Sequence, residues 1–331
     1  MMARASERRV LVAPDSFKGT MSAADVAAAL GRGFEAAGWE VELCPLGDGG
    51  AGTGEALRAV LGGEVVEVCT HDPIGREMVG SFVVLGDGRT AVVETACASG
   101  LALLAPNERN PLLASTGGTG ELIAAASRHA DRVLVAVGDS ATNDGGTGAI
   151  AAIGNARGVA DTELVCLCDV RTPWERAAAT FAPQKGASAE GVAELERRLE
   201  WIARELPRDP RGVANTGAGG GLAGGLWARL GAKLVDGAAF VCDAVGLDER
   251  IGRATLVVSG EGRIDATTLE GKIVNEVARR CRDADVALHA VVGTDGSTPE
   301  IQDGLALRSV REAGDPAALE AAAAALAAEH S

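Results

Sequence analysis

The chain has 331 residues, 47% of them hydrophobic and 23% charged, a composition typical of a folded globular protein rather than a disordered one. Its formal net charge of −15 argues against nucleic acid and anionic membranes as partners. The seven cysteines are scattered and lack zinc-ligand spacing, which favours reduced thiols in a cytoplasmic protein. No signal peptide is recognisable, and no apolar run reaches the roughly 20 residues of a membrane span.

The first part of the chain alternates strand and helix signals. Two apolar runs, 10–13 and 41–46, predict strands, and Ser22 with Asp25 predicts a capped helix after the first of them. A lysine just before a helix start is unfavourable for the helix dipole unless it serves an anionic ligand, although a solvated turn lysine is an equal alternative. The loops after the two strands contain Asp15, Ser16 and Lys18, then Asp48, Gly49 and Gly50.

The pattern changes near residue 67. Three short β-rich runs, 65–69, 81–85 and 90–95, follow one another with turns but no helices between them. Successive strands of this kind pair antiparallel, so a different domain is expected to begin here. Farther on, Thr119 is expected to cap a helix over 120–129.

The most informative stretch is 132–153, which predicts a strand, a polar glycine loop and a helix. In an open α/β sheet such a loop lies at the carboxyl end of the strand, where ligands bind. The helix start offers N–H groups and a partial positive charge suited to a phosphate or carboxylate. An ordinary capped turn is the alternative, but one cap residue would suffice for it. The loop contains Ser140, Thr142, Asn143 and Asp144.

Polar groups recur after later strands. Asp169 ends the run 164–170, where a carboxylate can bind magnesium or a hydroxyl, or cap a helix over 172–179. Lys185 precedes a charged helix over 189–206, mostly a solvated face. The strand 255–259 leads into a loop where an arginine could clamp a carboxylate and acids could bind a metal or accept a proton. That loop and the next helix start contain Glu261, Arg263, Asp265 and Lys272.

The predicted fold is α/β with two domains. Two N-terminal strands join 255–259, 286–292 and 307–310 in a five-stranded parallel sheet. The Rossmann-like domain is therefore discontinuous, 1–67 plus 237–331, and a mixed α/β domain, 68–236, is inserted into it. The active site is expected in the cleft between them.

Residues alone predict a small-molecule phosphate or carboxylate enzyme. The chain lacks a P-loop, the protein-kinase motifs and the G-x-S-x-G elbow of hydrolases. Gly47, Gly49 and Gly52 fit G-x-G-x-x-G, with Glu67 as the distant acid, so a dinucleotide oxidoreductase is an alternative. The motif follows the second strand rather than the first, and Asp48 would face a pyrophosphate, which disfavours it.

Five motifs together resemble the bacterial glycerate kinase family, the class unrelated to ribokinase-like kinases. They are APDSFKG (13–19), GDGG (47–50), SATNDGG (140–146), APQKGA (182–187) and SGEGRID (259–265). The resemblance implies ATP-dependent phosphorylation of D-glycerate with Mg²⁺, with 2-phosphoglycerate favoured over 3-phosphoglycerate. It implies ATP and a small organic acid as partners and leaves a homodimer open.

The resemblance also implies roles for the motif residues. Lys18 and Lys272 would meet phosphate or the glycerate carboxylate, and Arg263 would clamp a carboxylate. Asp169 or Asp265 would act as base or magnesium ligand. The expected catalytic residues are Lys18, Asp169 and Asp265, and Asp169 and Asp265 are the expected metal ligands. The remaining expected binding residues are Asp15, Ser16, Asp48, Gly49, Gly50, Ser140, Thr142, Asn143, Asp144, Lys185, Glu261, Arg263 and Lys272.

The chain departs from the family pattern inside these motifs. Asp139 stands where glycine is usual, Ala51 replaces a glutamate, and Gly117 replaces a tyrosine. The loop after Asp169 is also shorter than usual. These changes favour two alternatives: a kinase for another small hydroxy acid, or a catalytically weak relative that acts as a ligand-binding protein.

Overall fold

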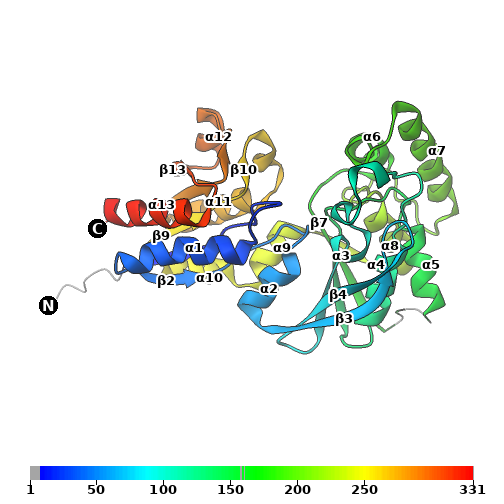
Figure 1. Ribbon diagram of the computed structural model, residues 1–331, viewed down its shortest axis with the longest axis horizontal. Helices are drawn as coiled ribbons and strands as arrows, with labels where there is room; N and C mark the ends of the chain where they lie inside the picture. Colours follow the sequence, from blue (N-terminus) through cyan, green and yellow to red (C-terminus); the bar gives the residue numbers. More distant parts are fainter. Residues whose placement is uncertain (1–7, 157–158, 160, 331) are drawn as a thin grey trace. The chain divides into compact units, whose positions relative to one another are not determined.

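The computed structural model describes residues 8–156, 159 and 161–330. The chain forms two compact units, which Figure 1 shows coloured along the sequence. Unit 1 contains the described residues up to Asp48, then Glu55–Val60, and the chain from Ala238 onward; unit 2 contains Gly49–Gly54 and Leu61–Gly237. Among the described residues, no helix has the length and apolarity needed to cross a membrane.

Unit 1 contains the predicted five-stranded parallel sheet, in the order β13-β11-β9-β1-β2. Its strands are short apolar runs whose carboxyl ends share one edge, so the loops that follow them gather there. They are β1 (Arg9–Val12), β2 (Glu40–Leu43), β9 (Leu256–Ser259), β11 (Leu288–Val292) and β13 (Leu307–Glu312), with a small separate pair, β10 (Arg263–Ile264) and β12 (Thr294–Asp295).

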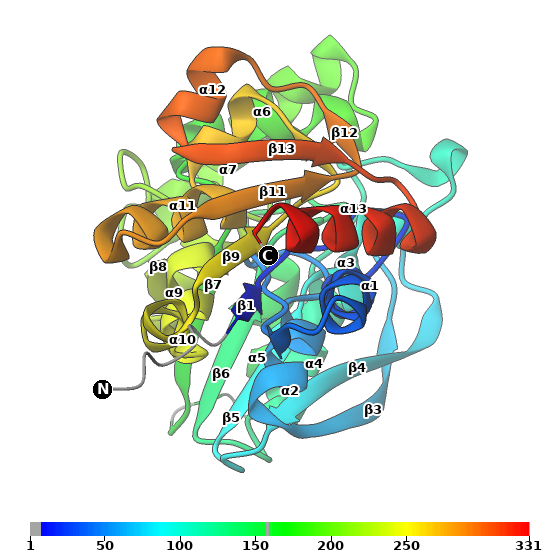
Figure 2. The same ribbon diagram turned by 90° about the vertical axis from the view of Figure 1, so that its left-hand side faces the viewer.

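Helices cover both faces of this sheet. Helix α1 (Ala23–Ala36) and α13 (Pro316–Glu329) lie on one side, and α10 (Leu247–Arg253) and α11 (Ile273–Ala284) lie on the other (Figure 2). Ser22 caps α1 as predicted, because its hydroxyl accepts from Asp25 N at 3.2 Å. The other helices are α2 (Thr53–Leu61), whose residues are divided between the units, α9 (Gly237–Ala244) and α12 (Pro299–Gly304).

Unit 2 contains a six-stranded mixed sheet in the order β3-β4-β5-β6-β7-β8. The β3–β4 and β4–β5 pairs are antiparallel, as the change in pattern predicted, and the later pairs are parallel. The strands are β3 (Gly63–His71), β4 (Glu77–Leu85), β5 (Thr90–Glu94), β6 (Arg132–Ala136), β7 (Glu163–Cys168) and β8 (Lys233–Asp236). Strand β3 begins before residue 68, and the short β8 was not predicted.

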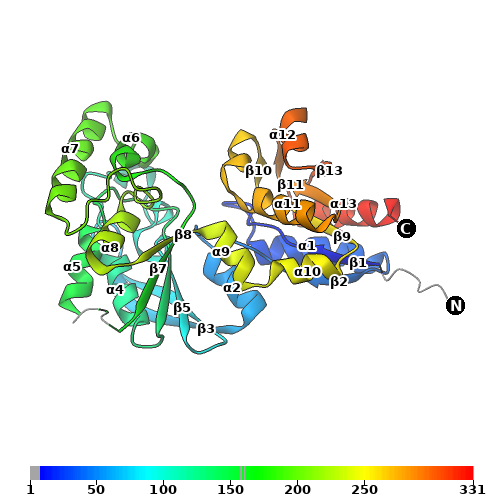
Figure 3. The same ribbon diagram turned by 180° about the vertical axis from the view of Figure 1, so that it is seen from behind.

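Helices α4 (Gly117–Ala126), α5 (Thr147–Asn155) and α8 (Leu222–Leu230) lie together in unit 2 (Figure 3), and their apolar residues join the strands in one core. The prediction that Thr119 caps a helix over 120–129 is wrong, because α4 starts earlier and places Thr119 inside it. The helix predicted over 172–179 corresponds to α6, which is shorter and begins later, at Ala177. The remaining helices are α3 (Ala96–Ser99), α6 (Ala177–Phe181), after a 3₁₀ turn at Trp174–Arg176, and α7 (Ala189–Glu205).

Candidate functional site

Unit 1 has a cavity of about 430 Å³ at the carboxyl edge of its sheet. The loop after β1 and the loop after β9 form most of its lining, as expected for a parallel sheet. Eight residues predicted from the sequence line it together: Asp15, Ser16, Lys18, Asp48, Glu261, Arg263, Asp265 and Lys272.

Three carboxyl groups in this cavity, those of Asp15, Asp48 and Glu261, are buried. Burial raises the pKa of Asp15 well above its usual value, the charge of Asp48 adds to this, and the Ser16 N–H at 2.7 Å opposes it. Burial also raises the pKa of Glu261, against the opposing effects of the Thr268 hydroxyl and Lys272. The Glu261 carboxylate accepts from Thr268 at 2.6 Å and lies 3.6 Å from the Lys272 ammonium. Carboxyl groups with raised proton affinity beside cations suit proton transfer and phosphate binding.

Asp265 has a structural task in the same loop. Its Oδ1 accepts from the N–H of Thr267 at 2.9 Å and from the Thr267 hydroxyl at 2.7 Å, so it caps the 3₁₀ turn Ala266–Glu270. The Thr267 hydroxyl is the main cause of a lowered pKa at Asp265. Arg263 Nε donates to its other oxygen at 3.3 Å. These contacts hold the loop in shape, and the role of Asp265 as base or metal ligand stays a prediction.

Unit 2 has a second polar group, around Lys185. This lysine is 3% exposed, and its Nζ donates to Ser140 Oγ at 2.9 Å and to the Thr142 carbonyl at 2.7 Å. Burial lowers the pKa of Lys185 to about 7, although Asp169 and Asp144 oppose the shift. The sequence placed Lys185 in the loop before a charged helix; the structure adds that it is buried and that its ammonium contacts the predicted loop 140–144.

Two atoms of that loop are buried without a hydrogen-bond partner among the described residues. Thr142 is 0% and Asn143 is 1% exposed, and the unpaired atoms are Thr142 Oγ1 and Asn143 Oδ1. The Asn143 amide is oriented by its Nδ2, which donates to the Ala177 carbonyl at 3.3 Å. An unpaired buried polar atom costs about 1–3 kcal/mol, so such atoms commonly indicate where a ligand or water binds.

Asp144 serves the loop itself. Its carboxylate accepts from Thr116 N at 2.9 Å, Thr116 Oγ1 at 2.8 Å, Gly146 N at 3.0 Å and Gly148 N at 3.2 Å. The start of α5 was expected to offer its N–H groups to an anionic ligand, but Asp144 already binds two of them. It also binds the residue before α4, which explains where that helix begins.

The glycine loop 49–52 joins the loop after β6 inside unit 2. Gly138 N donates to Gly49 O at 3.0 Å, and Ala51 N donates to Asp139 Oδ2 at 3.0 Å. Asp139 has φ of 56°, a left-handed conformation that favours glycine. The two departures from the family pattern, at 51 and 139, are therefore in direct contact. A Cβ on Gly138 would lie 3.0 Å from Asp169 Oδ2, which brings this predicted residue to the same place.

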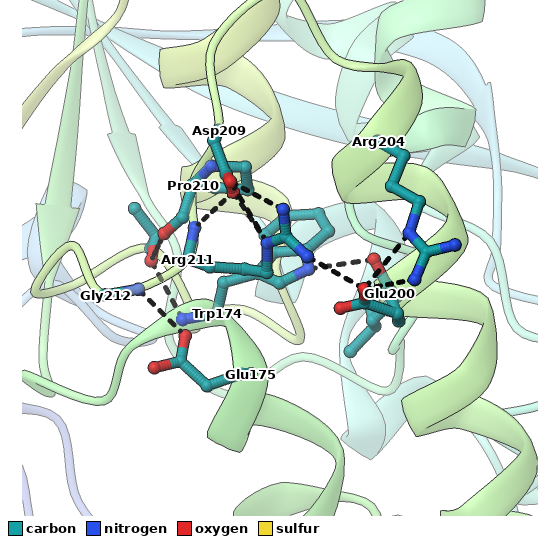
Figure 4. Close-up of polar contacts among 10 residues, drawn as sticks. Trp174, Glu175, Glu200, Arg204, Asp209, Pro210, Arg211 and Gly212 are labelled. Carbon is teal, nitrogen blue, oxygen red and sulfur yellow. Dashed lines mark hydrogen bonds and ion pairs between the residues drawn. The ribbon is translucent and has the colours of Figure 1, made fainter.

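Trp174 and the loop 209–216 support the Lys185 group. The Trp174 indole donates to Leu199 O at 3.0 Å and is fully buried, with its ring against Gly145 and Gly221. Figure 4 shows how ion pairs of Arg211 with Asp209 and Glu200 fix the loop that follows α7. Farther along that loop, Gly220 packs so tightly on the Thr142 carbonyl that any side chain there would collide with it.

The structure thus brings the predicted residues into two groups. One lines the unit 1 cavity, and the other gathers at the carboxyl ends of β6 and β7 in unit 2. The second group contains Gly49, Gly50, Ser140, Thr142, Asn143, Asp144, Asp169 and Lys185. Sequence reasoning missed Arg109, a half-buried residue whose backbone packs against Gly186, next to Lys185; its sequence signal is its position in the polar segment before α4.

Comparison with known proteins connects both groups to one family. The sequence profile of the glycerate kinase family matches residues 10–158 and 155–328. The glycerate kinase of Bacillus subtilis (strain 168) is 36% identical over 324 residues, 86% of this chain and 85% of its own. The glycerate 2-kinase of Escherichia coli (strain K12) is 36% identical over 308 residues, 82% and 81% respectively. A crystal structure of a protein assigned as glycerate kinase 2 from Salmonella typhimurium LT2 matches with a TM-score of 0.84 at 31% identity, covering 97% of this chain and 98% of that one.

Proposed function

Because this chain belongs to the glycerate kinase family, we propose that it transfers the γ-phosphoryl group of ATP to D-glycerate and forms 2-phosphoglycerate. The chain is an enzyme of the kinase class. The choice of the 2-hydroxyl is supported by the relative named glycerate 2-kinase. In this reaction the hydroxyl oxygen bonds to the γ-phosphorus, the bond to the bridging oxygen of ADP breaks, and the hydroxyl proton passes to a base.

The observation that carries the proposal is the mixed charge of the unit 1 cavity. Phosphoryl transfer depends on positioning, on cations that stabilise the phosphate charge and on a base near the acceptor hydroxyl. Lys18 and Lys272 are the cations for phosphate oxygens. Asp15 is the strongest base candidate in this cavity, because burial and the charge of Asp48 raise its proton affinity. Asp169 in unit 2 remains the other candidate.

The cavity also fits Mg²⁺ carried by ATP. With Asp15 as the base candidate, Asp48 and Glu261 supply oxygen ligands, the type that Mg²⁺ prefers, and Mg²⁺ commonly uses one or two carboxylates plus substrate phosphates. In the described part of the chain, no three or more acidic, His or Cys side chains are already gathered around one point. When bound, Mg²⁺ would neutralise charge on the phosphates.

We further propose that both units serve one reaction, with unit 1 acting on the phosphates and the Lys185 group of unit 2 binding the acid. The polar character of both groups supports this division. A variant in either group, Lys18→Ala or Asn143→Ala, should then lower turnover of the same substrate pair. Loss from only one of them would refute the shared reaction.

An ADP-release assay on the full chain tests the function. ATP with Mg²⁺ is offered together with D-glycerate, L-glycerate, lactate or glycerol, and phosphorus NMR identifies the product. The expected result is ADP release that depends on D-glycerate, with a signal of 2-phosphoglycerate. Release with another acid but not D-glycerate would favour the alternative kinase. This alternative is supported by Ala51 and Asp139, which both differ from the family pattern and contact each other. Nucleotide binding without turnover of any acid would contradict the kinase proposal.

A further inference from the structure

Arg109 and Arg211 are the two half-buried arginines among the described residues of unit 2. Arg211 pairs with Asp209 at 2.6 Å and with Glu200 at 2.8 Å. Arg109 makes no ion pair with any described residue, and its Nε is buried without a hydrogen-bond partner. Leaving a buried N–H of a charged group without a hydrogen bond costs free energy, so an anionic ligand is the natural partner.

Packing places the backbone of Arg109 beside Gly186, which follows Lys185 in the chain. Gly186, next to Lys185, lies so close that a Cβ on it would be 2.7 Å from Arg109 O and 3.3 Å from Arg109 Cβ. The segment that carries Arg109 also packs on the loop 140–144, because Leu104 and Ala114 form a small buried cluster with Ala141. Arg109 therefore belongs to the same corner of unit 2 as the two unpaired buried atoms.

Thr142 Oγ1 and Asn143 Oδ1 suit the hydroxyl groups of a small acid whose carboxylate a guanidinium binds. Asn143 Oδ1 is an acceptor held in place by the contact of its amide nitrogen with Ala177, and Thr142 Oγ1 can donate or accept. A small hydroxy acid presents a carboxylate, which a guanidinium binds through two parallel N–H groups, and hydroxyl groups, which donate to an amide oxygen.

We propose that Arg109 and Asn143 form the subsite that recognises the organic acid. Arg109 binds its carboxylate, and Asn143 Oδ1 accepts a hydrogen bond from one of its hydroxyl groups. The inference rests on the proposed function for the identity of the acid. It moves carboxylate recognition from Arg263, Lys18 and Lys272 of unit 1 to unit 2, and it leaves those cations for phosphate.

The test compares Arg109→Gln, Arg109→Lys and Asn143→Ala with the wild-type chain. Arg229→Gln is the matched control, because Arg229 is an exposed arginine at the end of α8 in the same unit. We expect Arg109→Gln to raise KM for D-glycerate at least about tenfold, as for a lost charge-assisted hydrogen bond, with KM for ATP within twofold. Arg109→Lys keeps the charge without the planar fork and should give an intermediate value. Asn143→Ala should raise the same constant, and Arg229→Gln should change neither.

Two further measurements make the result decisive. The wild-type chain should prefer D-glycerate over glycerol, which lacks the carboxylate, and this preference should be smaller in Arg109→Gln. If Arg109 had only a structural role, the substitution would lower the activity with both substrates alike. Calorimetric titration of D-glycerate with a non-hydrolysable ATP analogue present should show binding to wild type and at least about tenfold weaker binding to Arg109→Gln. Equal binding by the two proteins, or a raised KM for ATP alone, would overturn the subsite. A wild-type chain that neither binds nor phosphorylates D-glycerate would instead refute the proposed function.

Discussion

The ammonium of Lys185 lies 2.7 Å from the carbonyl oxygen of Thr142, so a buried cation holds the backbone of the predicted glycine loop. The same nitrogen contacts Ser140 Oγ at 2.9 Å. A charge in this position is expensive, because burial removes it from water, and the lowered pKa of Lys185 reflects that cost. The loop is thus ordered by a group that changes its charge near neutral pH.

Lys185 should give the protein a measurable pH dependence of stability. Its pKa falls from 10.5 to about 7 on folding, so between these values the unfolded chain holds a proton that the folded chain has released. Stability therefore rises with pH in this window, by at most about 5 kcal/mol. Urea denaturation of wild type and Lys185→Met at pH 7 and pH 10 measures this. The gain with pH should be larger for wild type, and an equal gain in both proteins would contradict the buried, shifted lysine.

His289 should make the stability of the protein depend on pH in the acid range. This residue lies on β11, its Nδ1 is 2.8 Å from Ser309 Oγ, and its ring meets His330 edge-on at 5.0 Å. Burial, followed by the charges of His330 and Arg311, lowers the pKa of His289 to about 4. The unfolded chain therefore binds the proton first as pH falls from about 6.5 to 4, and up to about 3 kcal/mol of stability is lost. His289→Gln should lose less over this range, and parallel curves would rule the effect out.

Lys18 is expected to matter for activity and not for folding. It is an exposed residue that lines the unit 1 cavity. Lys18→Ala should lower kcat/KM at least about a hundredfold, the low end for a catalytic group, while the melting temperature stays within about 2 °C. Lys233→Ala, which removes only a surface lysine paired with Glu163, is the control. Full turnover by Lys18→Ala would remove this residue from the mechanism.

Asp265 should affect both stability and activity. Because its carboxylate caps the turn Ala266–Glu270, Asp265→Ala should lower the free energy of unfolding by about 1 kcal/mol. Asp265→Ser retains a capping oxygen without the carboxylate and should be close to wild type in stability. If Asp265 is also the base or a metal ligand, Asp265→Ser should still lose at least about a hundredfold in kcat/KM. Near-normal kcat/KM in this variant would leave Asp265 with the capping role alone.

Asp139 provides a test of backbone strain. Its φ of 56° costs a side-chain-bearing residue about 1 kcal/mol, and its carboxylate offsets part of this through the Ala51 N–H. Asp139→Ala keeps the strain and loses the hydrogen bond, whereas Asp139→Gly loses both. We expect the glycine variant to be more stable than the alanine variant by about 1 kcal/mol in urea denaturation. The reverse order would show that residue 139 does not adopt this conformation.

Much of the architecture follows from the sequence because it depends on local patterns. Apolar runs separated by glycine loops and helix signals predicted the parallel sheet of unit 1, and β-rich runs without helices predicted the antiparallel strands of unit 2. Strand β8, whose apolar residues are Leu234 and Val235, was missed. Its strand conformation depends on pairing with β7, which is distant in the chain.

By itself the sequence determined the fold class, the family resemblance and the loops that carry polar residues, since strand ends and motifs are local properties. Only the tertiary structure decided what each polar residue does. Lys185 and Ser140 are 45 positions apart, and burial of the lysine depends on that contact. Asp144 binds Thr116, 28 positions away, and Arg109 lies beside Gly186 for the same reason. Hydrogen-bond partners and desolvation arise from residues brought together by folding, and no local pattern encodes them.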